Sequence, residues 1–326
     1  MDGIDHERHN QNSHCIVELG SKKNAALLIT ILSLTNIAPI SQAQDMEPRA
    51  FTNTPVGLNF LIAGYGYTHG DVATDPSLPI ENVQVEAHNE IVAYVRSLDV
   101  WGDSGKLQLF LPTAWVNGTG NVFGQPHERE VFGLGDPKVR FSVLFYGAPA
   151  LSAQDFKNYK QDFVIGGTFL VSIPLGQYDS SKLLNIGTNR WAFRPELGVS
   201  KAFGRLTCDL AGAVIWYTDN NNFLNGHTRA QDPIASVEGH LSYNIRPGLW
   251  IALDGIFFSG GRSSIDGVEG LDDHQKNVRG GITIALPVNR HNAIKLFAST
   301  GFITRPGSSN FNAYGIAWQY RWGAGL

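Results

Sequence analysis

The stretch Tyr314-Gly-Ile-Ala-Trp-Gln-Tyr-Arg-Trp322, close to the end of the chain, decides the fold. Its alternate residues from Tyr314 to Trp322 are all aromatic or branched apolar, and the residues between them are small or polar. Side chains of a strand alternate between two faces, so this pattern predicts an amphipathic strand. An apolar face that ends in aromatic residues is typical of the closing strand of an outer-membrane β-barrel, with Gln319 and Arg321 facing the lumen.

Similar alternation fills the chain after Gln44, in segments near the ~10 residues that a tilted strand needs to cross the outer membrane. We therefore predict an all-β fold, a single antiparallel transmembrane β-barrel of about 12 strands preceded by a cleavable signal peptide. The expected strands begin near Val56, Val83, Leu107, Val139, Phe163, Trp191, Leu206, Val237, Leu249, Val278, Ile294 and Tyr314.

The links between these segments alternate in length, as expected for short periplasmic turns and longer outer loops. The short links are Trp101–Gly105, the turn at Gly204, Arg246–Gly248 and Asn289–His291. The long ones are Asp71–Asn82, Asn117–Phe132, Gly176–Arg190, Asp219–Pro233 and Gly260–Lys276. Two links depart from the pattern, because Gly147–Lys160 is long for a periplasmic turn and Thr304–Asn310 is short for an outer loop.

The first 43 residues have the order of parts of a secretory signal. Lys22 and Lys23 precede the apolar stretch Ala25–Leu34, and Ser41-Gln-Ala43 is a small-x-small cleavage site. The polar stretch before Lys22 is long for a signal and is consistent with a start placed too far upstream. We expect residues 1–43 to be the signal region, 44–55 an N-terminal linker, 56–322 the barrel and 323–326 a C-terminal tail.

Composition narrows the function classes. The formal net charge is −4, and removal of residues 1–43 takes away three basic and four acidic side chains, so no nucleic-acid partner is predicted. Cys208 then stands alone, which excludes an internal disulfide framework. The histidines lack the spacing of metal ligands, and we predict no metal and no cofactor.

The polar faces of the segments are expected to line the lumen. Enclosing charge is costly unless opposite signs are balanced, and acids and bases are mixed on these faces. The residues that we expect to line the lumen are Arg96, Arg140, Arg194, Glu196, Glu238, His240, Asp254 and Arg279, with Glu86, Glu90, Asp209, Lys138, Lys295 and Arg321 on the same faces.

The block from Asn185 to Trp191 supports two interpretations. The side chains of Asn185, Thr188, Asn189 and Arg190 can bond to nearby backbone and shape a loop, whereas Trp191 sits at the mouth of a strand. These residues either build a loop or line a constriction of the pore.

Several signatures follow one another in a fixed order over the mature chain. They are Gly133-Leu-Gly-Asp-Pro137, Ile173-Pro-Leu-Gly-Gln-Tyr178, Asn185–Trp191, Arg194-Pro-Glu-Leu-Gly198, Gly260-Gly-Arg262 and the closing Trp318–Trp322. From about Gly57 to Trp322 the chain resembles the outer-membrane β-barrel family named for the meta-pathway of phenol degradation. The resemblance implies a transporter in the outer membrane of a Gram-negative bacterium, through which small hydrophobic or aromatic solutes pass passively. It also implies contacts with outer-membrane lipid and with the barrel assembly machinery, although Gly323–Leu326 follow the last aromatic residue, where such strands usually end.

Two other classes stay open at this stage. A barrel-borne hydrolase would use His240 with Ser236 or Ser242, which flank it on one strand face. A periplasmic or secreted β-sandwich, acting as a binding or structural module, would show the same alternation without a membrane. The sequence leaves open the solute, the direction of transport, the oligomeric state and whether residues 147–160 fill the lumen. We favour the channel, because same-face polar neighbours are common in any wet lumen.

Overall fold

The computed structural model describes residues 46–71, 80–122, 125–182, 184–270, 274–304 and 310–324. The predicted signal region lies outside these residues. Regular structure in the described part is almost entirely β, with one short 3-10 turn, η2 (Asp155–Asn158). In that part, no helix is long and apolar enough to cross a membrane.

The strands in chain order are β1 (Leu58–Asp71), β2 (Ile80–Val100), β3 (Asp103–Val122), β4 (Gln125–Leu134), β5 (Lys138–Pro149), β6 (Phe163–Ser172), β7 (Ala192–Phe203), β8 (Leu206–Tyr217), β9 (Asn220–Phe223), β10 (His227–Gln231), β11 (Ile234–Arg246), β12 (Leu249–Gly260), β13 (Ser263–Ile265), β14 (Val268–Glu269), β15 (Gln275–Pro287), β16 (Asn292–Thr304) and β17 (Asn310–Gly323).

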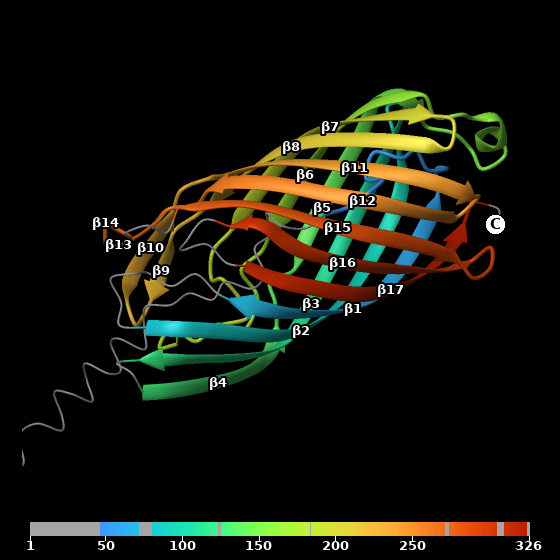
Figure 1. Ribbon diagram of the computed structural model, residues 1–326. Coiled ribbons are helices and arrows are strands. Elements are labelled where there is room, and N and C mark those ends of the chain that lie inside the picture. Colours follow the sequence, from blue (N-terminus) through green and yellow to red (C-terminus); the bar gives the residue numbers. More distant parts are fainter. Residues whose placement is uncertain are drawn as a thin grey trace, which may run out of the picture.

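Twelve of these strands form a closed antiparallel ring (Figure 1), which confirms the predicted barrel. The ring runs β1-β2-β3-β5-β6-β7-β8-β11-β12-β15-β16-β17, and β17 returns to pair with β1 along its whole length, from Leu58 opposite Gly323 to Asp71 opposite Asn310. Strand β4 pairs with β3 beyond the point where β5 stops pairing with it. Closure gives every strand in the ring a hydrogen-bonded neighbour on both sides, so the ring has no open edge, as a membrane interior requires.

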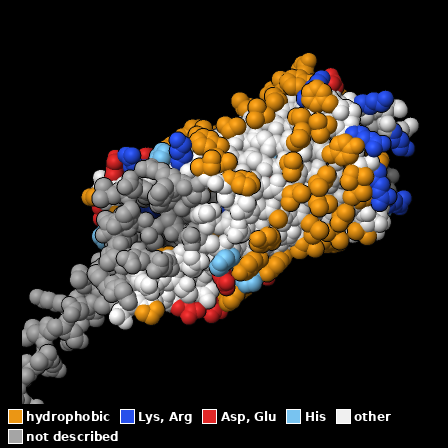
Figure 2. Space-filling model, viewed as in Figure 1, with side chains coloured by type: hydrophobic (Ala, Val, Ile, Leu, Met, Phe, Trp, Pro, Cys, Tyr) orange, Lys and Arg blue, Asp and Glu red, His pale blue; other side chains and the backbone are white. Residues whose placement is uncertain are grey.

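The outer surface of the ring carries a belt of apolar side chains (Figure 2), which is the arrangement of a barrel that faces lipid. On the closing strand, Tyr314, Ile316 and Trp318 are 40–53% exposed, as the alternation predicted. The β-sandwich alternative is wrong, because two separate sheets would bury such a face against each other. The belt includes Phe141, Phe169, Leu197, Leu210, Trp216, Val237, Leu241, Leu253, Phe257 and Trp322.

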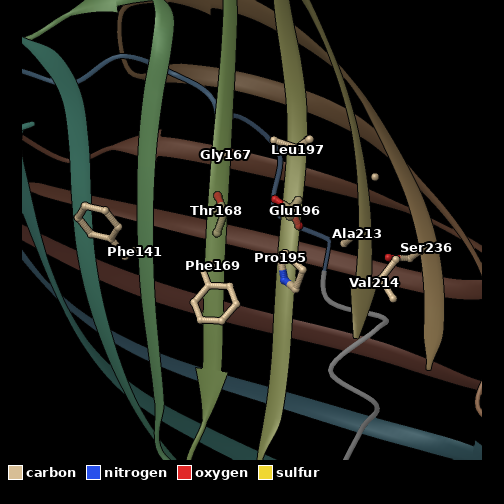
Figure 3. Close-up of a pocket in the computed structure, with 11 residues that line it drawn as sticks. Phe141, Gly167, Thr168, Phe169, Pro195, Glu196, Leu197, Ala213, Val214 and Ser236 are labelled. Atoms are coloured by element: carbon tan, nitrogen blue, oxygen red, sulfur yellow. The ribbon is translucent and has the colours of Figure 1, made fainter. Parts of the chain in front are cut away.

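A shallow hollow of about 710 Å³ lies in this belt, over β5 to β8 and β11 (Figure 3). Phe141, Phe169 and Leu197 surround it. Gly167 and Gly212 also line it and contribute no side chain. At Gly212 an added methyl group would meet nothing closer than a backbone oxygen 3.9 Å away. The hollow is therefore a gap between belt side chains, open toward lipid.

The two ends of the barrel differ in the way that the sequence predicted. At the short-link end, tight turns join β2 to β3, β7 to β8, β11 to β12 and β15 to β16, and the C-terminus lies at the same end (Figure 1). The longer link between β5 and β6, which contains η2, is also there. At the opposite long-loop end, β9, β10, β13 and β14 form a separate small sheet.

The orientation of β2 differs from the prediction. Val83, Val85 and Ala87 are buried inside the barrel, whereas Glu86 and Glu90 are exposed on its outer side. The reason is a loop, residues 173–191, that folds into the long-loop end and needs an apolar wall. Its residues Leu184 and Ile186 share one buried cluster with Val83, Val85, Ala87, Ala114, Val116 and Val131.

Candidate functional site

A segment before the first strand, residues 46–57, lies inside the barrel and is named here the N-terminal segment. Sequence analysis assigned most of it to a linker. Its Phe51 is only 3% exposed and contacts the inward faces of β5 to β8, in a cluster with Leu144, Ala148, Val164 and Ala211. The ring of Phe51 lies directly on Gly198, where a methyl group would come within 2.3 Å of it. Gly198 thus provides the space for an aromatic anchor that holds the segment.

Polar contacts fix the rest of the N-terminal segment to the wall. The backbone N–H of Arg49 donates to Asp209 at 3.2 Å, and its guanidinium donates to the amide oxygen of Asn244 at 2.9 Å. The ammonium group of Lys106 donates to two carbonyl oxygens of the segment, those of Ala50 at 3.3 Å and Thr52 at 3.0 Å. These are contacts that a few moving side chains could break, since a single hydrogen bond contributes only about 1 kcal/mol net.

Glu47 is the point where the N-terminal segment meets a group of cations. Its carboxylate accepts a hydrogen bond from Arg140 of β5 and pairs with it as a salt bridge. Enclosure in the lumen by itself would raise the pKa of Glu47. The positive charges of Arg140, Lys295 and Lys106 outweigh that effect and lower the pKa to about 2, from an ordinary value of 4.5. Glu47 is therefore a fixed negative charge at physiological pH.

The N-terminal segment divides the lumen into two cavities. The inner cavity, about 1020 Å³, lies toward the short-link end, and the outer cavity, about 430 Å³, lies toward the long-loop end. Three charged side chains line both cavities, those of Glu47, Arg140 and Lys295, so they form the boundary between them. Much of the outer cavity is apolar, with Phe110, Pro112, Leu170, Ile186, Phe297 and Phe311 in its wall.

A buried network of charges lies on the wall formed by β7, β11 and β12. Arg194 reaches Glu196 at 2.9 Å and Glu238 at 3.8 Å, and all three side chains are less than 10% exposed. His240 is bonded through Nδ1 to Asp254 at 2.8 Å. Burying so many charges is tolerable only because opposite signs are in contact.

The outer half of the lumen also holds Arg279 of β15 and Asp254 of β12. Arg279 donates to the backbone oxygen of Phe311 at 2.9 Å and lies over its ring at 3.7 Å. Asp254 accepts a second hydrogen bond from Thr283 at 2.6 Å. Each of these charged groups is thus held against the wall by its neighbours.

Comparisons with known proteins place these features in a family. The family described as MetA-pathway of phenol degradation matches residues 65–320, which is most of the chain. The chain belongs to this family. No curated protein matches the chain at a significant level.

Solved structures share the barrel fold with this family member. A COG4313 outer membrane channel from Pseudomonas putida F1 superposes with a TM-score of 0.73 at 19% identity, covering 85% of this chain and all of that one. The transport unit of the autotransporter AIDA-I from Escherichia coli has a TM-score of 0.50 at 8% identity, with coverage of 91% and 97%. These likenesses support the fold, and together with the closed ring and its apolar belt they make this MetA-pathway family member an outer-membrane β-barrel.

The structure brings most of the predicted lining residues of this family member together in the lumen. Arg140, Arg194, Glu196, Glu238, Asp254 and Arg279 border the two cavities, and His240 lies buried between Glu238 and Asp254. Arg96 does not join them. It is exposed on the outer side of β2, where it donates to Asn59 at 3.4 Å, while its neighbours Val95 and Ser97 face inward. A strand has only two faces, so the apolar wall that β2 presents to the lumen sends Arg96 outward.

The block from Asn185 to Trp191 builds a loop more than it lines a pore. The amide of Asn185 bonds to the backbone at Asp179 and Lys182, and Asn189 adopts positive φ and donates to Asn220. Arg190 is buried over the ring of Tyr217 at 4.2 Å. Trp191 is 41% exposed and stacks on Phe193 at 6.3 Å, on the outer side of β7. The loop contributes Ile186 to the outer cavity.

Asp136, in the turn between β4 and β5, ties this loop to the barrel. Its carboxylate accepts hydrogen bonds from the backbone N–H of Gly176 at 2.9 Å, and from the N–H and hydroxyl of Thr188 at 2.9 and 2.6 Å. The carboxylate therefore joins the two ends of the loop at one point.

We expect Asp136→Ala to loosen residues 173–191, because three partly buried hydrogen bonds lose their acceptor, and a donor left without a partner costs up to about 1–3 kcal/mol. Limited proteolysis of intact cells should cut within this loop, while the barrel still shows heat-modifiable migration. Ser152→Ala, which removes an exposed hydrogen bond to Asp155 at the short-link end, is the matched control and should leave the loop protected. Equal protection of both variants would contradict this role of Asp136.

Sequence reasoning missed Glu47, Phe51 and Asp136. The N-terminal segment is irregular, so it has no period that could reveal an inward face. Asp136 appeared only within the signature Gly133–Pro137, with no role of its own. Lys106, on the inward face of β3, was also missed, although an alternation centred on Leu107 would have placed it opposite the apolar belt. Lys295 was expected on a lumen face, but not as a partner of Glu47.

The geometry around His240 is half of a hydrolase site. Asp254 orients the imidazole, but Nε2 of His240 has no hydrogen-bond partner in the described part, and the carboxylate of Glu238 lies 4.0 Å from it. The hydroxyl of Ser242 likewise has no partner among the described residues. A nucleophile hydrogen-bonded to its base is thus not formed. In the same part of the chain no group of three or more potential metal ligands converges.

Proposed function

We propose that this protein is a passive outer-membrane channel for small hydrophobic or aromatic compounds. One observation carries the proposal, namely the apolar outer cavity inside a closed barrel, separated from the inner cavity by the N-terminal segment. Cavities of several hundred Å³ lined by aromatic side chains with a few polar groups are typical sites for small organic molecules. Membership of the MetA-pathway of phenol degradation family supports this class of solute.

Passage requires the N-terminal segment to move. Burial of Phe51 contributes about 1.5–3 kcal/mol, and the hydrogen bonds of Arg49 and Lys106 about 1 kcal/mol each. A barrier built from a few such contacts permits a minor population of molecules in which the N-terminal segment has left its place. A solute that binds in the space so vacated would increase this open population. The direction of transport then follows the concentration gradient.

The channel is favoured over the hydrolase that the sequence left open. A reactive serine would need to bond to His240, and Glu238 approaches that nitrogen instead. The buried Arg194, Glu196 and Glu238 line the large inner cavity of the barrel rather than a closed pocket for an acyl group. We expect no catalysis from this cluster.

The test uses vesicles whose outer leaflet contains lipopolysaccharide, since such leaflets slow the entry of hydrophobic molecules. N-phenyl-1-naphthylamine is a neutral aromatic probe whose fluorescence rises when it enters the hydrocarbon interior of the bilayer. We expect faster entry into vesicles with the folded protein than into protein-free vesicles or vesicles with a narrow eight-stranded barrel. Entry at the protein-free rate, with a barrel that is folded by heat-modifiable migration, would refute the channel.

A further inference from the structure

The carboxylate of Glu47 occupies a site that fits a solute anion. It lies at the boundary of the two cavities, where Arg140 and Lys295 also face both of them. Arg140 binds it directly, and Lys106 and Lys295 add their positive charge. One carboxylate therefore lies among three cations that come from three different strands, β3, β5 and β16. This arrangement is a carboxylate-binding site whose present ligand belongs to the protein itself.

The space beside this site is shaped for an apolar group. The outer cavity begins at Glu47. On the inward faces of β3 and β16 it is lined by Phe110, Pro112 and Phe297. Arg140 also lies over the ring of Phe110, at 5.5 Å. A molecule that places a carboxylate among the cations would therefore extend an aromatic ring into an apolar, ring-lined space.

The other acids of the outer cavity are already engaged. Asp254 is bonded to His240 and Thr283, and Asp136 to the loop that it holds. Glu90, which also borders this cavity, accepts a hydrogen bond from Thr113 at 2.9 Å. Removal of the Glu47 carboxylate thus leaves the boundary with an excess of positive charge, and enclosed charge calls for a counter-ion.

We propose that the boundary of the two cavities is a binding site for aromatic monocarboxylates, and that Glu47 is an internal mimic that competes with them. The inference deepens the proposed function, on which it rests, by naming an anionic class of solute. Binding of such a solute displaces Glu47 and with it the N-terminal segment, so the same event fills the site and opens the path. A neutral aromatic molecule does not compete with the Glu47 carboxylate for the cations, so its binding does not depend on the charge of Glu47.

The test measures binding of sodium benzoate and of benzamide, its neutral isostere, to the purified full chain in detergent by titration calorimetry. We expect Glu47→Gln to bind benzoate at least about tenfold more tightly than the unsubstituted protein, because the internal competitor has lost its charge. Benzamide should bind equally to both. Adding Lys295→Met or Arg140→Gln to Glu47→Gln should abolish the tighter binding of benzoate. If one of these double variants does not fold, the other is enough for the test.

Glu128→Gln is the matched control, because Glu128 is an exposed acid on the outer side of β4, bonded to Asn117. It should leave the affinity for benzoate unchanged. A gain for benzamide as large as that for benzoate would overturn the proposal, since it would reflect only a loosened segment. No gain for benzoate would overturn it as well. Probe entry into vesicles is an independent readout, so failure of the channel and failure of the carboxylate site are distinguishable.

Discussion

Gly198→Ala is expected to release the N-terminal segment and to raise the conductance of the barrel several-fold. The new methyl group would lie 2.3 Å from two ring carbons of Phe51 and 3.0 Å from the side chain of Ala211. Neither the strand nor the ring can yield by that distance, so the aromatic anchor must leave its place. With the anchor gone, the two cavities join. Single-channel recordings in planar bilayers measure the change directly.

Gly212→Ala provides the control for this prediction. Gly212 lies on the neighbouring strand β8, opposite Leu197, and faces the lipid-side hollow rather than the lumen. A methyl group there meets only a backbone oxygen at 3.9 Å, so the conductance should equal that of the unsubstituted protein. If Gly198→Ala and Gly212→Ala conduct alike, Phe51 is not the anchor of the segment.

Arg194→Ala is expected to cost about 3–5 kcal/mol of folding stability, the range for removing one partner of a buried ion pair. The substitution leaves Glu196 and Glu238 buried side by side without their cation. Reversible urea unfolding from lipid vesicles, followed by tryptophan fluorescence, gives the free energy of unfolding. The double variant with Glu238→Gln should recover part of the loss, because one of the two unpaired charges is then removed.

Lys201→Ala, on the same strand, separates this effect from the general loss of a cation. Lys201 pairs with Asp162 at 2.6 Å, but the two side chains are 37% and 77% exposed. Exposed pairs contribute about 0–1 kcal/mol, so a small change is expected. A loss after Lys201→Ala as large as that after Arg194→Ala would mean that burial of the Arg194 network is not the cause.

Much of the fold could be predicted because the pattern that identifies a strand lies within a few neighbouring residues of the sequence. The alternation of Tyr314, Ile316 and Trp318 needs no knowledge of distant residues, and the same applies to the other eleven strands of the ring. The alternation does not say which face is inside. On β2 the face is chosen by contact with Leu184 and Ile186, roughly a hundred residues later in the chain, and Arg96 was misplaced for that reason.

The candidate site was less accessible from the sequence. Arg194, Glu196 and Glu238 are polar residues on otherwise apolar strands, so their period indicates the lumen. Glu47 and Phe51 belong to a segment in which apolar and polar residues do not alternate regularly. Their role depends on how this segment fills the lumen of the barrel. The close approach of Phe51 to Gly198 is a match of shapes, and no pattern of residue types within either segment records it.

The position of the N-terminal segment also constrains the order of assembly. The seam between β1 and β17 joins the two ends of the strand order, so loop-closure entropy makes it the last pairing expected to form. Phe51 lies seven residues before the start of β1 and ends up on the concave side of the sheet. We therefore expect the segment to reach that side while the sheet is still an open trough, because a segment left outside a closed barrel could enter only past the rim of the short-link end.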